Sequence, residues 1–149
     1  MIRRRYLLVA SGGGHLKELY ESLPDDFDFS QATLLTYKTK TVSQDGGVVK
    51  FIVNPHRSLL AYALCFAQTF FYFLKYRPEF IISSGAGIAV PSIFLTKYFS
   101  AKLIFIETAA SVNVPSRTGK FAYQHATVFV VQYEGLKQYF PNAKLGRLL

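Results

Sequence analysis

Cysteine is rare in this sequence and tryptophan is absent. The 149 residues include one cysteine, Cys65, and three histidines. A single cysteine excludes a disulfide within the chain and fits a reducing compartment. Its apolar surroundings predict a small core residue. Because the histidines and Cys65 show no metal-ligand spacing, we expect no metal site and no cofactor.

The sequence also lacks an uncharged run as long as a typical membrane span. The run from Ser58 to Leu74, which no other uncharged run exceeds, falls short of the roughly 20 residues that a spanning helix needs. We therefore expect a buried or interfacial helix there. The apolar stretch from Tyr6 to Ala10 is too short for the core of a secretion signal.

Acidic residues are scarce, with nine against 17 lysines and arginines, and the formal net charge is +8. Half of the residues are apolar, which is too many for a disordered tail. The length suits a single domain over residues 1–149. A basic surface suits nucleic acid, anionic lipid or a diphosphate. No nucleic-acid motif is present, so we expect no nucleic-acid partner.

An aromatic run next to basic residues favours contact with a membrane surface. The residues concerned are Phe70, Phe71, Phe73, Lys75 and Arg77. Aromatic side chains beside lysine and arginine suit the interface between lipid and water. The alternatives are an ordinary solvated surface for the charges and a buried core helix for the phenylalanines.

Short apolar runs alternate with helical patterns along the whole chain. Strands are predicted over Tyr6–Ala10, Ala32–Tyr37, Val48–Val53, Phe80–Ser84, Lys102–Glu107 and Thr127–Val131. Helices are predicted over residues 16–23, 58–76, 91–99, 118–124 and 134–140. This alternation predicts a Rossmann-like α/β fold, a parallel sheet with helices on both faces.

Three unusual segments follow predicted strands. They are Ser11 to His15, Ser84 to Gly87, and Glu107 to Pro115. In an open parallel sheet, ligands bind outside the carboxyl ends of the strands. We therefore expect the functional site at this edge of the sheet.

The first segment, Ser11, Gly12, Gly13 and Gly14, has the character of an anion cradle. Glycines before a helix let backbone N–H groups approach a phosphate or diphosphate. The alternative is a tight turn without a ligand. The spacing G-x-G-x-x-G of dinucleotide sites is missing, and so is the G-K-[ST] ending of a nucleotide-binding P-loop.

Histidine and glutamate supply the candidate reactive groups. His15 begins the following helix, where it is either a base or a histidine bonded to backbone. Glu107 ends a strand, where it is either functional or the cap of a neighbouring loop. Gly85 and Gly87 form a second close-approach loop or, equally, a packing turn.

Taken together, these motifs resemble a known family. They are Ser11–Leu16, Ser83–Gly87 with Pro91, Glu107 with Pro115–Lys120, and Val131–Tyr133. The set is similar to bacterial capsule and exopolysaccharide glycosyltransferase accessory subunits. Those are related to the eukaryotic membrane-anchoring subunit of the transferase that adds the second N-acetylglucosamine to a dolichyl diphosphate. The resemblance implies the amino-terminal half of a GT-B glycosyltransferase.

The resemblance also implies roles for particular residues. Ser11 to Gly14, with Gly85 and Gly87, would face the acceptor's diphosphate. His15 and Glu107 would be catalytic, with His15 as the base and Glu107 lining a cleft between subunits. The carboxyl-terminal segment, including Gly146, Leu148 and Leu149, would dock the partner.

The implied function is one half of a two-component, UDP-sugar-dependent glycosyltransferase. The chain would bind a polyprenyl-diphosphate-linked saccharide as acceptor, and a separate catalytic subunit would bind the UDP-sugar. It would lie peripherally on the cytoplasmic face of the cell membrane and be inactive alone. Two alternatives are a non-catalytic scaffold that stimulates a catalytic partner and a free-standing nucleotide-binding protein.

Overall fold

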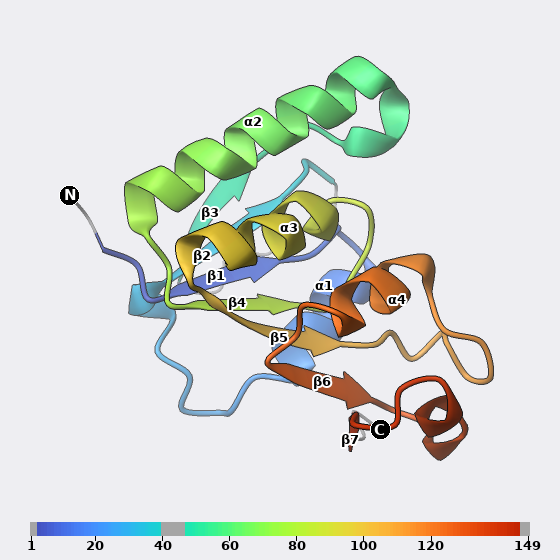
Figure 1. Cartoon of the computed structure of the whole chain (residues 1–149). Helices are drawn as coiled ribbons and strands as arrows, with labels where there is room; N and C mark the ends of the chain where they lie inside the picture. Colours follow the sequence, from blue (N-terminus) through green and yellow to red (C-terminus); the bar gives the residue numbers. More distant parts are fainter. Residues whose placement is uncertain (1–2, 40–46, 147–149) are drawn as a thin grey trace.

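The strands form one parallel sheet in the computed structural model, which describes residues 3–39 and 47–146 (Figure 1). Among these residues the sheet has seven strands, in the order β3-β2-β1-β4-β5-β6-β7. All neighbouring strands are parallel. The strands are β1 (Tyr6–Val9), β2 (Ala32–Thr36), β3 (Val48–Phe51), β4 (Phe80–Ser83), β5 (Lys102–Ile106), β6 (Val128–Val131) and β7 (Lys144–Leu145). The predicted Rossmann-like α/β fold is confirmed.

Four α-helices connect the strands within the described residues. They are α1 (Gly14–Glu21), α2 (Leu59–Tyr76), α3 (Ala89–Phe99) and α4 (Arg117–Tyr123). Short 3₁₀ turns are η1 (Phe29–Gln31), η2 (Pro55–Arg57) and η3 (Glu134–Gln138). Ser58 caps α2 as predicted, because its hydroxyl accepts a bond from the Ala61 amide at 3.1 Å. The helix predicted over residues 134–140 is only η3, since Gly135 and Pro141 both disfavour an α-helix.

The helices cover the two faces of the sheet unequally (Figure 1). α2, α3 and α4 lie on one face, and α1 lies on the other. Right-handed crossovers produce this arrangement, because the chain leaves β1 toward β2 and later moves from β4 toward β6 in the opposite direction. The larger core therefore lies under α2, α3 and α4, where Leu7 and Val9 of β1 point. Leu8 points to the smaller core under α1.

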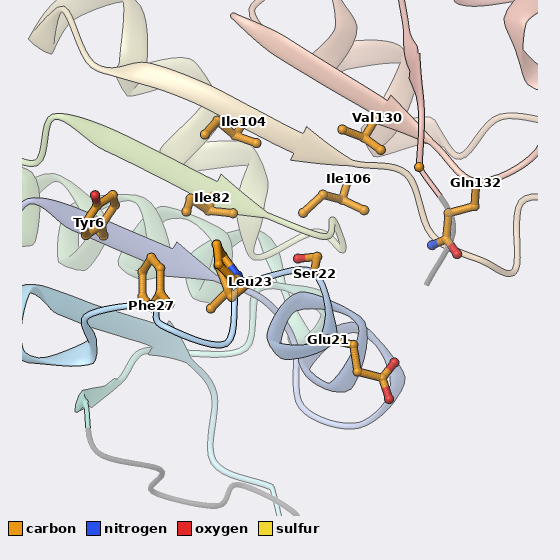
Figure 2. Close-up of a pocket in the computed structure, with 12 residues that line it drawn as sticks. Tyr6, Glu21, Ser22, Leu23, Phe27, Ile82, Ile104, Ile106, Val130 and Gln132 are labelled. Carbon is orange, nitrogen blue, oxygen red and sulfur yellow. The ribbon is translucent and has the colours of Figure 1, made fainter. Parts of the chain in front are cut away.

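Part of the α1 face remains open as an apolar groove (Figure 2). Its floor is formed by Ile82, Ile104, Ile106 and Val130 from β4, β5 and β6. The groove has a volume of about 500 Å³ and ends beside Gly146. No helix covers these three strands on this side within the described residues, since α1 lies beside them.

Helix α2 buries one stripe and exposes the rest of an almost entirely apolar surface. Its buried residues are Ala61, Cys65, Thr69, Phe73 and Tyr76. By length and composition α2 could also cross a membrane, although only 28% of it is buried inside the protein. Phe73 has no exposed surface and its ring packs on Phe99. The prediction that Phe73 contacts a membrane is therefore wrong, whereas Phe70 and Phe71 are exposed.

Candidate functional site

The segments after β1 and β4 lie at the point where the strand order reverses. β1 pairs with β2 on one side and with β4 on the other. The chain leaves β1 for one edge of the sheet and leaves β4 for the other. Such a switch point opens a crevice at the carboxyl ends of the strands, where ligands of open α/β sheets bind. The structure thus brings Ser11–His15 and Ser84–Gly87 together.

The three consecutive glycines meet different requirements. A Cβ on Gly12 would lie 2.1 Å from Oγ1 of Thr39, so only glycine fits against the segment after β2. Gly13 has a φ of 86°, in the left-handed region that favours glycine. A Cβ on Gly14 would meet no described atom within 4 Å. Packing therefore explains Gly12 and backbone conformation explains Gly13, whereas neither requires a glycine at position 14, where the space is open to a ligand.

The second loop is built on buried serines. Ser83 is buried, and its hydroxyl donates to the Val9 carbonyl at 2.7 Å and accepts from the Gly85 amide at 3.1 Å. The first bond ties the end of β4 to the end of β1, and the second holds the turn that follows β4. Gly85 and Ala86 then adopt φ values of 104° and 71°. A left-handed alanine is strained, and such residues concentrate at functional loops.

His15 is oriented by the backbone of the second loop. Its Nδ1 lies 3.0 Å from the carbonyl oxygen of Ser84, and the hydroxyl of Ser84 donates in return to the carbonyl of His15. A carbonyl only accepts, so Nδ1 must carry the proton in this bond. The other nitrogen, Nε2, is then left with a free lone pair in the neutral ring. The interpretation of a histidine bonded to backbone is confirmed. The role of His15 as a base stays a prediction.

Glu107 is completely buried and does not line an open cleft. A Cβ placed on Gly119 would lie 1.7 Å from Oε2 of Glu107, so this carboxylate faces the first turn of α4. Its two oxygens have no hydrogen-bond partner among the described residues. The Glu107 backbone carbonyl accepts from the Gln132 side chain at 3.0 Å. The expectation of an open, cleft-lining carboxylate is contradicted, because the side chain turns inward under α4.

Glu18, which the sequence analysis missed, holds the third segment in place. Its Oε1 accepts from the Thr108 hydroxyl and from the Ala109 amide, both at 3.1 Å. α1 therefore fixes the loop that follows β5 as well as presenting His15. The helical spacing of His15 and Glu18, one turn apart, was the available signal.

His56 was also missed, although it lies at the same edge. It belongs to η2, which follows β3, and a Cβ on Gly87 would lie 2.7 Å from Nε2 of its ring. The carboxyl ends of all parallel strands lie at the same edge of the sheet, and this is true of β3 as well as of β1 and β4. The same reasoning could therefore have found His56.

The remaining predicted site residues fall elsewhere. Gly146 lies at the end of the apolar groove, where a Cβ would be 2.8 Å from Cγ1 of Val130. Leu148 and Leu149 lie outside the described residues. In residues 3–39 and 47–146, no three His, Cys, Asp or Glu side chains gather as a metal site.

Comparison with known proteins places these features in a family. A family model described as "Oligosaccharide biosynthesis protein Alg14 like" matches residues 50–148. A protein of Saccharomyces cerevisiae named UDP-N-acetylglucosamine transferase subunit ALG14 is 27% identical over 143 residues, which make up 95% of this chain and 57% of the yeast protein. A Candida albicans protein of the same name is 37% identical over 82 residues, which make up 51% of this chain and 37% of that protein.

The chain thus spans about half the length of these two relatives. The family match includes the loop after β4, Glu107 and the segment up to Gly146, and it begins after the Ser11–His15 loop. Because the match extends over more than half of the chain, the protein belongs to the Alg14-like family of oligosaccharide biosynthesis proteins.

Proposed function

We propose that this protein is the acceptor-side subunit of a two-component, UDP-sugar-dependent glycosyltransferase. Its acceptor would be a saccharide linked to a polyprenyl diphosphate, used in capsule or exopolysaccharide assembly. The Alg14-like fold is the amino-terminal half of a GT-B glycosyltransferase. The observation that carries the proposal is the pair of glycine loops at the switch point, with His15 oriented between them.

The two loops suit a diphosphate for electrostatic reasons. α1 begins at this edge of the sheet, and no side chain caps its first amides. α3 begins at the same edge, but its first two amides donate to the carbonyls of Ala86 and Gly87, and Pro91 has no N–H. The N-terminus of a helix attracts anions through its free N–H groups and its dipole. Glycines at positions 13 and 14, where a Cβ would meet no described atom, let the phosphate oxygens approach the backbone.

His15 would act as the general base. In the proposed reaction the acceptor hydroxyl attacks the anomeric carbon of the donor sugar and gives its proton to Nε2 of His15. The bond between that carbon and UDP breaks, and UDP leaves with the electron pair. Because Nδ1 is held by the Ser84 carbonyl, Nε2 is the nitrogen that is free to accept.

The donor site would come from a partner subunit. Both relatives are named as subunits of a UDP-N-acetylglucosamine transferase. The apolar groove beside Gly146 is a suitable docking surface for such a partner, because β4, β5 and β6 present isoleucines and a valine there without a helix over them. Docking would place the partner next to the carboxyl edge, where Ile106 and Gln132 also line the groove.

Membrane contact would come from α2, on the cytoplasmic side and without crossing the bilayer. We call the exposed residues Leu60, Leu64, Phe71 and Leu74 the outer stripe. They recur at helical spacing on the side opposite the buried stripe. Phe94 and Tyr98 of the neighbouring α3 are exposed as well.

The charges around the outer stripe fit an anionic lipid surface. Lys75 and Lys97 lie in the last turns of α2 and α3, and Arg77 directly follows α2. Neither helix contains an acidic residue. Basic residues beside exposed aromatic side chains favour the interface of a membrane with anionic lipids.

One experiment separates this proposal from the scaffold alternative. The buried position of Glu107 favours the scaffold, since it removes one of two predicted catalytic groups from the cleft. We expect sugar transfer only when the chain is combined with its catalytic partner. We expect His15→Ala to lower kcat by about a hundredfold or more while partner binding persists. Transfer by the isolated chain, or an unchanged kcat in the variant complex, would contradict the proposal.

A further inference from the structure

Two imidazole rings flank the Gly85–Gly87 loop. A Cβ on Gly85 would lie 3.8 Å from Cε1 of His15. A Cβ on Gly87 would lie 2.7 Å from both Cε1 and Nε2 of His56. The rings come from separate connections, His15 from the start of α1 and His56 from η2 between β3 and α2. The loop after β4 is therefore enclosed by histidine on two sides.

The backbone around His56 is fixed before any ligand binds. The Val53 amide donates to Oε1 of Gln68 at 2.8 Å, which ties this segment to α2. The His56 amide donates to Oδ1 of Asn54 at 3.0 Å, and Pro55 is buried. The His56 side chain is nevertheless exposed. A fixed backbone that presents an exposed imidazole is a preorganised arrangement for binding a ligand.

We infer that His56 is a second ligand-binding residue of this site and that its ring donates a hydrogen bond to the diphosphate of the acceptor. The inference rests on the proposed function and adds a residue that binds the acceptor. His56 stands over Gly87, two residues before α3 begins. A diphosphate held by the loop between β4 and α3 would therefore lie within reach of the ring.

The position of the His56 ring, and not the backbone conformation, accounts for a glycine at position 87. Its φ is not in the left-handed region, so glycine is not required there by the backbone. The space that a Cβ would need is instead taken by the exposed His56 ring. In Gly87→Ala the ring must move aside, which costs little stability because an exposed side chain can rotate. This variant therefore displaces the ring without removing it.

The kinetic test uses the complex with the catalytic partner. We expect His56→Ala to raise KM for the polyprenyl-diphosphate acceptor by about ten- to a hundredfold, the effect of one hydrogen bond to a charged group. KM for the UDP-sugar should stay unchanged. His56→Gln retains an N–H donor and should recover part of the loss. His125→Ala is the matched control, because His125 packs against Phe121 after α4 and should leave KM unchanged.

The Gly87→Ala variant tests whether acceptor binding depends on the position of the His56 ring over residue 87. Alone, it should raise KM for the acceptor, and added to His56→Ala it should have little further effect. Additive effects of the two substitutions would overturn the inference. So would an unchanged acceptor KM in His56→Ala when His15→Ala impairs the same complex, and in that case the proposed function would stand.

A binding test distinguishes the lipid diphosphate from the nucleotide as its source. The full chain is titrated by calorimetry with farnesyl diphosphate and, separately, with UDP. We expect farnesyl diphosphate to bind, and His56→Ala to weaken it by about tenfold or more. Preference for UDP, or equal binding by wild type and variant, would overturn the inference. This result does not require transfer activity, so it remains decisive if the proposed function fails.

Discussion

At the scale of single residues, Glu107 and Gly119 compete for one space. A methyl group at position 119 would overlap the Glu107 carboxylate, whose Oε2 is 1.7 Å from the Cβ position. Because Glu107 is buried, it cannot swing into solvent. We expect Gly119→Ala to lower the free energy of unfolding by about 1 to 3 kcal/mol, the usual cost of overpacking. Urea unfolding measures this change.

Two further variants show whether the contact is the cause. Gly135→Ala is the matched control, since a Cβ there meets no described atom within 4 Å, and its effect should be small. In a Glu107→Ala background the methyl group at position 119 gains room. The double variant should therefore lose less stability than the sum of the two single variants. Strict additivity would mean that the two side-chain positions do not compete.

Cys65 makes stability depend on pH in the alkaline range. Burial raises the pKa of its thiol to about 11, and a hydrogen bond with Thr69 opposes part of this rise. The folded state thus favours the neutral thiol more than the unfolded chain does. The resulting stabilisation is complete below pH 9.0, the ordinary value, and is lost as the pH approaches 11.

The alkaline loss of stability is measured by urea unfolding at neutral pH and across that alkaline window. We expect the wild type to lose more stability over the window than Cys65→Ala, because the variant lacks the titrating group. The thiol should also react slowly with alkylating reagents at neutral pH, where it is protonated and buried. Rapid alkylation of the folded protein would contradict this prediction.

At the scale of elements, the two stripes of α2 should respond differently to substitution. Leu64 and Phe71 of the outer stripe are 47% and 55% exposed, whereas Phe73 is fully buried. We expect Leu64→Ser with Phe71→Ser to reduce sedimentation with vesicles of anionic lipid while the thermal midpoint changes little. We expect Phe73→Ala to lower the free energy of unfolding by about 3 to 5 kcal/mol.

Vesicle binding and stability of the outer-stripe variant together show whether the outer stripe contacts a membrane or belongs to a core. If the outer-stripe variant binds vesicles as well as the wild type does, α2 is not the membrane contact. If it unfolds instead, the stripe is part of a core that the isolated chain does not complete. Vesicles without anionic lipid are a further control, because Lys75, Arg77 and Lys97 should then contribute less.

At the scale of the whole molecule, the pattern of strands and helices was predictable but the direction of particular side chains was not. Alternating apolar runs and glycine breaks predict six of the strands, and the parallel-sheet rule predicts the edge that holds Ser11–His15 and Ser84–Gly87. β7 was missed because Lys144 and Leu145 pair with β6 through tertiary contact alone. Nothing local marks so short a strand.

The misplaced residues share a physical reason. α2 is apolar nearly all round, so its sequence contains no amphipathic phase to show that Phe73 points inward. Glu107 ends a strand, but its side-chain direction depends on how α4 packs above it. Both orientations are set by contacts between elements distant in the sequence.

The open apolar groove is the proposed docking surface for the catalytic partner. Ile104 lies in the middle of β5 on the groove floor, beside Ile82 of β4 (Figure 2). If the partner docks there, a charge at this position would be buried without a counter-ion. We expect Ile104→Glu to weaken association with the catalytic partner by at least about tenfold, or 1.4 kcal/mol. Analytical ultracentrifugation of the mixed subunits measures the affinity.

A matched variant on the opposite side of the sheet separates docking from folding. Phe94→Glu introduces the same charge on α3, on the face away from the groove, and should leave partner affinity unchanged. The circular dichroism spectrum of Ile104→Glu alone should match that of the wild type, because the groove floor is already partly open. If only Phe94→Glu impairs association, the partner binds over α2 and α3. The surface assigned here to the membrane would then be the interface between subunits.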